Sequence, residues 1–187
     1  MDAAAWDQYH RAHRGDRGWA EETVIELLTA APAGRALDLG AGAGRHALWL
    51  ANRGWSVTAM DFSAEARAEL GRAAAEMPAA VAERLTVVDA DLTAPPADWL
   101  PAAAADLTLL IDVDLPEADL AALLPALPGS LGPGGGLLVQ VPVGGDGQAG
   151  LQAIRGALEP LLTLEYAGVL PAAEAGGRPS AFVFGRA

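Results

Sequence analysis

The sequence contains no cysteine, and all twelve of its basic residues are arginines. The lack of cysteine excludes disulfides, thiolate zinc sites and cysteine nucleophiles. The lack of lysine excludes catalysis through a lysine Schiff base. There is no apolar run of about 18 residues and no charged-then-apolar leader before Trp6, so we expect neither a membrane span nor a secretory signal. We therefore expect a cytoplasmic protein.

Positive charge is also scarce. Twelve basic residues face 24 acidic ones, a formal net charge of −12, and the region between Arg84 and Arg155 has no basic residue. Nucleic-acid binding needs clustered basic side chains to neutralise phosphates, so we expect no nucleic-acid partner. The excess of acidic residues has a second explanation, which is that it only keeps the protein soluble. With 187 residues, of which 52% are hydrophobic, the chain is long enough for one domain with a sizeable core.

The stretch from Ala36 to Ser63 reads as strand, glycine-rich loop, helix and second strand. Leu37 and Leu39 flank Asp38 in a short buried strand. Glycines that permit a sharp turn and close approach of a ligand follow it: Gly40, Gly42 and Gly44. The next strand, Trp55 to Met60, is followed by Asp61. A carboxylate at this edge of an open α/β sheet can accept hydrogen bonds from both hydroxyls of a ribose.

The rest of the chain continues the alternation of strands and helices. Further strands are predicted at 85–88, 107–111 and 137–141, with helices at 63–77, 117–131 and 151–158. Prolines make the second half of the 117–131 helix irregular. The last two apolar segments, 161–170 and 180–185, are joined by a connection too short for a crossover helix, so they should pair antiparallel.

The N-terminal segment carries a predicted helix in residues 21–30, preceded by a segment rich in aromatic and histidine side chains. These are Trp6, Tyr9, His10, His13 and Trp19. Two interpretations stay open: the aromatic side chains dock this arm on the body, or the arm is a lid with Tyr9, His10 or His13 reaching in. We expect residues 1–34 to form this arm and helix, and residues 35–187 to form one domain.

The glycine loop could serve a dinucleotide or another nucleotide-type cofactor. The dinucleotide fingerprint G-x-G-x-x-G has its third glycine where this chain has Arg45. The predicted antiparallel ending is also foreign to the doubly wound dinucleotide fold. An NAD-type oxidoreductase is therefore disfavoured.

The segment LDLGAGAGRHALWLANRGWSVTAMDFS resembles the S-adenosylmethionine-binding segment of class I methyltransferases, and VVDADL, LLIDVDLP and LGPGGGLLV resemble their later landmarks. The resemblance covers essentially all of residues 35–187. It is nearest to small bacterial methyltransferases of the tellurite-resistance and thiopurine type. It implies a Rossmann-like seven-stranded α/β sheet with helices on both faces, an antiparallel C-terminal strand pair, and S-adenosylmethionine as cofactor, with S-adenosylhomocysteine as product.

The resemblance also implies roles for individual residues. The loop Gly40, Ala41, Gly42 and Gly44 would contact the methionine part of the cofactor, and Asp38 would help to hold its amino group. Asp61 would bind the ribose hydroxyls. The adenine would be contacted by Phe62, Asp91 and the Leu92 backbone, and the methionine amine by the backbone around Ile111 and Asp112. Tyr9 of the arm is a further cofactor-binding candidate.

Methyl transfer is an in-line displacement that needs alignment and shielding, with a base only if the acceptor must lose a proton. The candidates are His10, His13 and Asp114, whereas His46 begins a helix and belongs to the cofactor loop. The pair Asp112 and Asp114 departs from the family pattern and favours a cationic or amine-bearing acceptor.

Because no inserted substrate domain is visible, we expect a small-molecule acceptor, and we predict no metal site. The alternative is an accessory or regulatory protein that keeps the fold and cofactor without transferring a methyl group. The accepting atom and the oligomeric state stay open.

Overall fold

The computed structural model describes residues 3–15, 18–171 and 178–187. The chain divides into two compact units, Met1–Asp91 and Leu92–Ala187. Residues 1–34, which we expect to form the arm and its helix, fall in the same compact unit as the glycine loop. None of the helices in the described residues is long and apolar enough to cross a membrane.

Three parallel strands form the sheet of the first unit: β1 (Arg35–Leu39), β2 (Ser56–Asp61) and β3 (Leu85–Asp89), in the order β3-β2-β1. The register pairs Asp38 with Ala59, and Asp61 with Asp89. Because parallel strands end at a common edge, the loops that follow these strands converge there.

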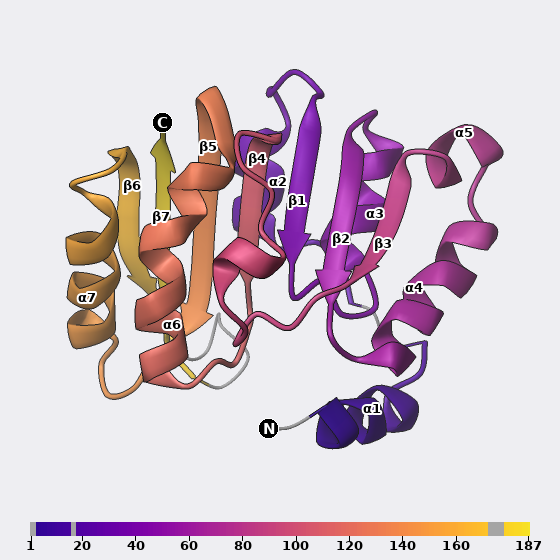
Figure 1. The fold of residues 1–187 in the computed structure, drawn as a ribbon, viewed down its shortest axis with the longest axis horizontal. Helices are drawn as coiled ribbons and strands as arrows, with labels where there is room; N and C mark the ends of the chain where they lie inside the picture. The colour runs from indigo at the N-terminus through magenta and orange to yellow at the C-terminus, as the bar shows by residue number, and fades with distance from the viewer. Residues whose placement is uncertain (1–2, 16–17, 172–177) are drawn as a thin grey trace. The chain divides into compact units, whose positions relative to one another are not determined.

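The helices of the first unit are α1 (Ala3–Ala12), α2 (Glu22–Leu28), α3 (Arg45–Asn52), α4 (Ala64–Ala75) and the short α5 (Ala79–Ala82). Helix α3 packs on β1, β2 and β3 through its buried apolar face, which includes Ala47, Leu50 and Ala51. Helix α4 packs on β2 and β3. Figure 1 shows α1 below the end of β2 and beside the start of α4. The first unit thus places α1 at the edge where its strands end.

The second unit holds β4 (Ala105–Ile111), β5 (Leu131–Pro142), β6 (Thr163–Leu170) and β7 (Ser180–Arg186), in the order β4-β5-β7-β6. Strands β4 and β5 are parallel, whereas β7 is antiparallel to both β5 and β6. The 3₁₀ helices η1 (Pro96–Asp98) and η2 (Leu124–Ser130) and the helices α6 (Glu117–Leu123) and α7 (Gln148–Leu158) complete the unit. The seven strands form the mixed α/β sheet with an antiparallel C-terminal pair that the sequence predicted.

The order of strands and helices predicted along residues 35–187 is confirmed, with differences at several boundaries. The helix expected over 117–131 ends as an α-helix at Leu123 and continues as η2, because Pro125 and Pro128 cannot donate helical hydrogen bonds. Strand β5 begins at Leu131, earlier than expected. The helices α1 and α5 were not predicted. Residues 172–177, within the connection to the last strand, lie outside the described part of the chain.

Candidate functional site

The loop after β1 is built by three glycines in left-handed backbone conformations. The φ angles of Gly40, Gly42 and Gly44 are +70°, +55° and +87°, a region that side-chain-bearing residues rarely adopt. The backbone N–H groups of Gly40 and Ala41 donate to the carbonyl oxygen of Met60 at 2.8 and 2.9 Å. The loop is thereby folded against the end of β2. A Cβ atom at Gly44 would also collide with Leu70 Cδ1 of α4.

The carboxylate of Asp61 ties this loop to the start of α4. Its Oδ2 atom accepts the N–H of Gly42 at 2.8 Å, and its Oδ1 atom accepts the N–H of Ser63 at 2.8 Å. The residue is buried. A carboxylate offers about four acceptor positions, so these two bonds leave roughly two for a ligand.

Asp38 is buried more deeply, at 2% exposure. Within the described residues its Oδ2 atom has no hydrogen-bond partner. Burial, with a smaller contribution from the charge of Asp61, raises the pKa of the Asp38 carboxyl to about 7, although Arg45 and a hydrogen bond from the Ala47 backbone act in the opposite direction. A buried carboxyl without a full set of partners is stabilised by a proton or by a cationic ligand.

The first turn of α3 is tied to the segment that precedes α2. His46 is buried, and its Nε2 atom accepts the backbone N–H of Glu21 at 3.2 Å. Burial, with a smaller contribution from the nearby positive charge of Arg45, lowers the pKa of His46 to about 3. Arg45 pairs with the Glu21 side chain at 3.0 Å. His46 is therefore a neutral structural group and unsuited to act as a base.

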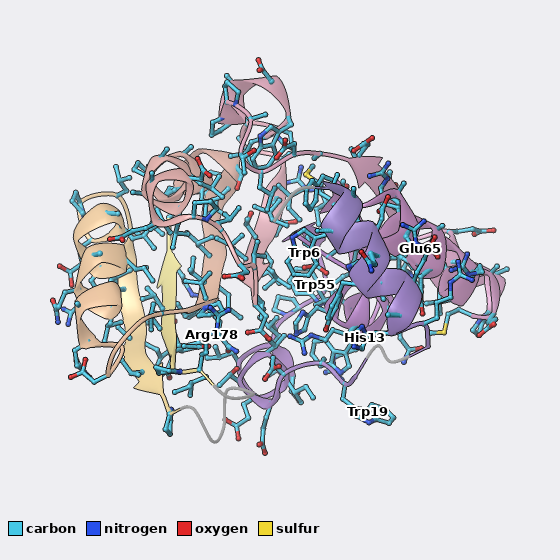
Figure 2. All side chains as sticks on the ribbon, turned by 90° about the horizontal axis from the view of Figure 1, so that it is seen from below. Trp6, His13, Trp19, Trp55, Glu65 and Arg178 are labelled. Carbon is cyan, nitrogen blue, oxygen red and sulfur yellow. The ribbon has the colours of Figure 1, made fainter. Side chains whose placement is uncertain are left out.

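Helix α1 brings His10 to the glycine loop. Its Cε1 atom lies 3.6 Å from the position that a Cβ atom would take at Gly42. His13, in contrast, is exposed, stacks on Tyr9 with ring centroids 4.2 Å apart, and is hydrogen-bonded through Nδ1 to the Tyr9 carbonyl at 2.8 Å. Figure 2 shows Trp19 pointing away from the first unit, and the residue is 91% exposed.

The adenine-contact candidates of the first unit follow β2 and β3. Phe62 is half-buried directly after Asp61, and Asp91 is exposed after β3. Sequence reasoning missed Arg67 of α4, whose guanidinium donates to the Asp61 carbonyl oxygen at 2.8 Å and pairs with Asp89 at 2.9 Å. Arg67 thereby joins the ends of β2 and β3, a role that only the packing of α4 reveals.

The remaining candidates belong to the second unit. Leu92 and Ile111 are buried. Asp112 is exposed with a φ of +55°, and its N–H donates to the Gln140 carbonyl oxygen at 2.7 Å. Asp114 forms an ion pair with Arg178 at 3.3 Å, so its charge is compensated. The expectation of a cationic or amine-bearing acceptor, which was drawn from the pair Asp112 and Asp114, stays a prediction.

The described residues contain no cluster of three or more histidine, aspartate or glutamate side chains that could hold a metal ion. The model of the family described as "Methyltransferase domain" matches residues 36–135, which is more than half of the chain. The chain belongs to this family. The resemblance drawn from the sequence to class I S-adenosylmethionine-dependent methyltransferases is thereby confirmed.

Solved structures similar to this methyltransferase include the glycopeptide N-methyltransferase MtfA complexed with S-adenosylmethionine, with 19% identity, a TM-score of 0.69 and 95% of each chain covered. The 1,6-didemethyltoxoflavin-N1-methyltransferase of Burkholderia thailandensis, with bound S-adenosylhomocysteine, has 19% identity and a TM-score of 0.69, over 98% of this chain and 88% of that one. The [4+2]-cyclase SpnF has 19% identity and a TM-score of 0.66, over 88% and 79%. At these identities the likeness establishes the fold. No curated protein matches the methyltransferase.

Proposed function

We propose that this protein transfers a methyl group from S-adenosylmethionine to a small-molecule acceptor. The observation that carries the cofactor assignment is the buried Oδ2 atom of Asp38, which has no hydrogen-bond partner in the described residues. The ammonium group of the cofactor's methionine part is a cation that would satisfy this carboxylate. A pyrophosphate would instead add negative charge beside it.

The other residues of the first unit fit the same cofactor. The unused acceptor positions of Asp61 suit the two ribose hydroxyls. The loop Gly40, Ala41, Gly42 and Gly44 allows close approach of a ligand to the backbone. We propose that Phe62 packs on the adenine and that Asp91 contacts its edge. The cofactor-binding roles of Tyr9, Leu92, Ile111 and Asp112 stay predictions.

When bound, S-adenosylmethionine would supply a methyl group attached to a sulfonium sulfur. When the methyl group passes to the acceptor, that sulfur becomes a neutral thioether. The protein's own part is to align the acceptor, to exclude water and, where needed, to accept a proton. We propose His10 as the base because its ring lies beside Gly42 of the glycine loop, whereas the other histidine near this loop, His46, is buried and has a lowered pKa. His13 and Asp114 are weaker candidates, since His13 is bonded to its own helix and Asp114 is paired with Arg178.

The support for a small-molecule acceptor is the absence of an inserted substrate domain from the sequence, together with similar structures that act on small molecules, such as the 1,6-didemethyltoxoflavin-N1-methyltransferase. The pairing of Asp114 with Arg178 reduces the case for a strongly cationic acceptor. We therefore propose no preference for the charge of the acceptor.

A second candidate is a protein that keeps the fold and the cofactor without methyl transfer. The observation that favours it is the similarity to SpnF, which is described as a [4+2]-cyclase. Cofactor binding alone does not separate the two candidates, so transfer itself must be measured.

The first test is calorimetric titration of the protein with S-adenosylmethionine, S-adenosylhomocysteine and NADH. We expect binding of the first two, and a loss of roughly tenfold or more in affinity in Asp38→Asn and Asp61→Asn, since hydrogen bonds to charged groups contribute about 1.5–3 kcal/mol. The exposed Asp98→Asn serves as a matched control and should bind as the wild type does. Absence of binding by the folded wild-type protein would refute the cofactor assignment.

The second test is a screen of small metabolites for transfer of an isotope-labelled methyl group. With a responsive acceptor, His10→Asn should lower kcat, whereas His13→Asn should leave kcat close to the wild-type value. A protein that binds the cofactor and methylates no acceptor would favour the second candidate.

A further inference from the structure

Helix α1 is anchored to the first turn of α4 by the carboxylate of Asp7. Its Oδ1 atom accepts a hydrogen bond from Ser63 Oγ at 2.6 Å and another from the Glu65 backbone N–H at 3.2 Å. Ser63 is the N-cap of α4, and its Oγ atom accepts the N–H of Ala66 at 3.1 Å. Asp7 therefore shares the capping of α4 with Ser63, so that a residue from another helix satisfies one of the free N–H groups at this end.

The segment after α1 is attached to the same helix. Arg14 Nε donates to Glu65 Oε1 at 2.9 Å, and the backbone N–H of Gly15 donates to Glu69 Oε1 at 2.6 Å. The Glu69 side chain is buried. The middle of α1, at Asp7, and the segment after α1 are thus both fixed on α4, and His10 lies between these two attachments beside Gly42.

Ser63 connects this anchor to the glycine loop. Its backbone N–H donates to Asp61 Oδ1 while its hydroxyl donates to Asp7. Asp61 in turn accepts a hydrogen bond from the N–H of Gly42, and the His10 ring lies beside Gly42. The contacts therefore run in sequence from Asp7 through Ser63, Asp61 and Gly42 to His10, and because Asp7 and His10 belong to the same helix they join α1, the start of α4 and the loop after β1.

We propose that Asp7 is a positioning residue, which acts through Ser63 to hold the Asp61 carboxylate and the glycine loop in place for the cofactor. The proposal rests on the proposed function, because Asp61 and the loop are the groups assigned to the cofactor. It follows that docking of α1 and binding of the cofactor are coupled, and the coupling is reciprocal: each favours the other by the same factor.

The length of α1 makes the coupling measurable. The helix has 10 residues, and isolated helices shorter than about 12–15 residues are marginal in water, so α1 depends on its docking contacts. Asp7 contributes two of the hydrogen bonds that hold it. Removing its carboxylate should loosen α1 and free the Ser63 hydroxyl to rotate, while the sheet beneath is untouched.

The test compares Asp7→Ala, Asp7→Asn and a control, Gln8→Ala, at an exposed neighbouring position of α1. Asp7→Ala should weaken binding of S-adenosylhomocysteine roughly 5- to 50-fold by calorimetry, a range typical of coupled sites. Asp7→Asn should recover most of the affinity, because its amide oxygen can accept both hydrogen bonds. Gln8→Ala should bind as the wild type does. In a Ser63→Ala background, Asp7→Ala should lower the affinity little further, because the hydrogen bond between the Ser63 hydroxyl and Asp7 is already absent.

The second measurement is amide hydrogen exchange of α1, with and without S-adenosylhomocysteine. The ligand should slow exchange across α1 in the wild type and not in Asp7→Ala, an effect that a merely structural role of Asp7 would not produce. Unchanged affinity in a folded Asp7→Ala, or no ligand-induced protection of α1 in a wild type that binds, would overturn the proposal and leave the proposed function intact. If Asp7→Ala does not fold, the proposal is judged by the ligand-induced protection of α1 in the wild type and by the affinity of Asp7→Asn for S-adenosylhomocysteine. A wild type that binds no cofactor would refute the proposed function, and this inference with it.

Discussion

At the scale of single residues, burial shifts the pKa values of two ionisable groups of the first unit in opposite directions. Asp38 lies at the end of β1 and His46 in the first turn of α3. Burial raises the pKa of the Asp38 carboxyl to about 7 and lowers the pKa of His46 to about 3. Each group is held in its neutral form over part of the pH range in which the unfolded chain would ionise it. The stability that the neutral Asp38 allows is lost as pH rises from 3.8 to about 7, whereas the stability that the neutral His46 allows is lost as pH falls from 6.5 to about 3, so the two effects oppose each other between these values.

The Asp38 effect is tested by Asp38→Asn. In the unfolded chain the carboxyl ionises near pH 3.8, whereas in the folded protein it does so near 7, so stability is lost as pH rises between these values and is constant above them. The asparagine side chain of the variant has no charge to bury. The variant should gain stability over the wild type between pH 5 and pH 8, by an amount on the order of a few kcal/mol.

The measurement is urea unfolding of both proteins at pH 5 and pH 8 without cofactor, with Asp98→Asn as the exposed control. If the difference in stability between Asp38→Asn and the wild type is the same at both pH values, the pKa of the Asp38 carboxyl is not raised as described. The same variant is expected to bind the cofactor more weakly. The Asp38 carboxylate would thus strengthen cofactor binding while it lowers the stability of the cofactor-free protein.

At the scale of elements, the glycine loop and α4 constrain each other through Gly44 and Leu70. Gly44 is the N-cap of α3 and has a left-handed φ of +87°, and a Cβ atom there would collide with the Leu70 side chain. Leu70 is almost completely buried. The close approach of α4 to the loop therefore requires glycine at this position for two reasons, one conformational and one steric.

Replacement of Gly44 by alanine should consequently destabilise the protein by about 2–5 kcal/mol, from the left-handed conformation and the overpacking together. Gly71 offers a matched control in α4: a Cβ atom there meets nothing within 4 Å, and alanine should stabilise the helix by about 0.5–1 kcal/mol. Chemical denaturation measures both. Equal tolerance of the two substitutions would show that the loop and α4 are not in contact as described.

At the scale of the whole molecule, the excess of carboxylates dominates the charge. Twelve arginines face 24 acidic residues, and several arginines already have acidic partners in exposed ion pairs, including Arg14, Arg155 and Arg186. Exposed pairs contribute little to stability. The remaining negative charges repel one another, and this repulsion opposes the compact state.

Salt should therefore stabilise this protein near neutral pH. Raising NaCl from about 10 to about 150 mM shortens the Debye length from roughly 30 to roughly 8 Å, which screens the repulsion. We expect Tm at pH 8 to rise by about a few degrees, and the effect to shrink near the sequence pI of 4.5. A fall in Tm with salt would mean that attractive ion pairs, rather than net repulsion, control the stability.

The sequence by itself determined the features that depend on local patterns. Alternating apolar residues and glycine spacing predicted the strands and the loop after β1, and the short final connection predicted the antiparallel pair. Family landmarks predicted the methyltransferase fold. These signals are readable because the residues that make them lie within a few positions of one another.

The contacts between distant segments were decided only by the tertiary structure. The capping of α4 by Asp7 joins residues 56 and 58 positions apart, and Asp114 is compensated by Arg178 from another part of the chain. The buried Oδ2 atom of Asp38 also became visible only once its surroundings were packed. Hydrogen bonds, ion pairs and burial of this kind depend on which surfaces the fold brings together, and periodicity along one segment carries no information about them.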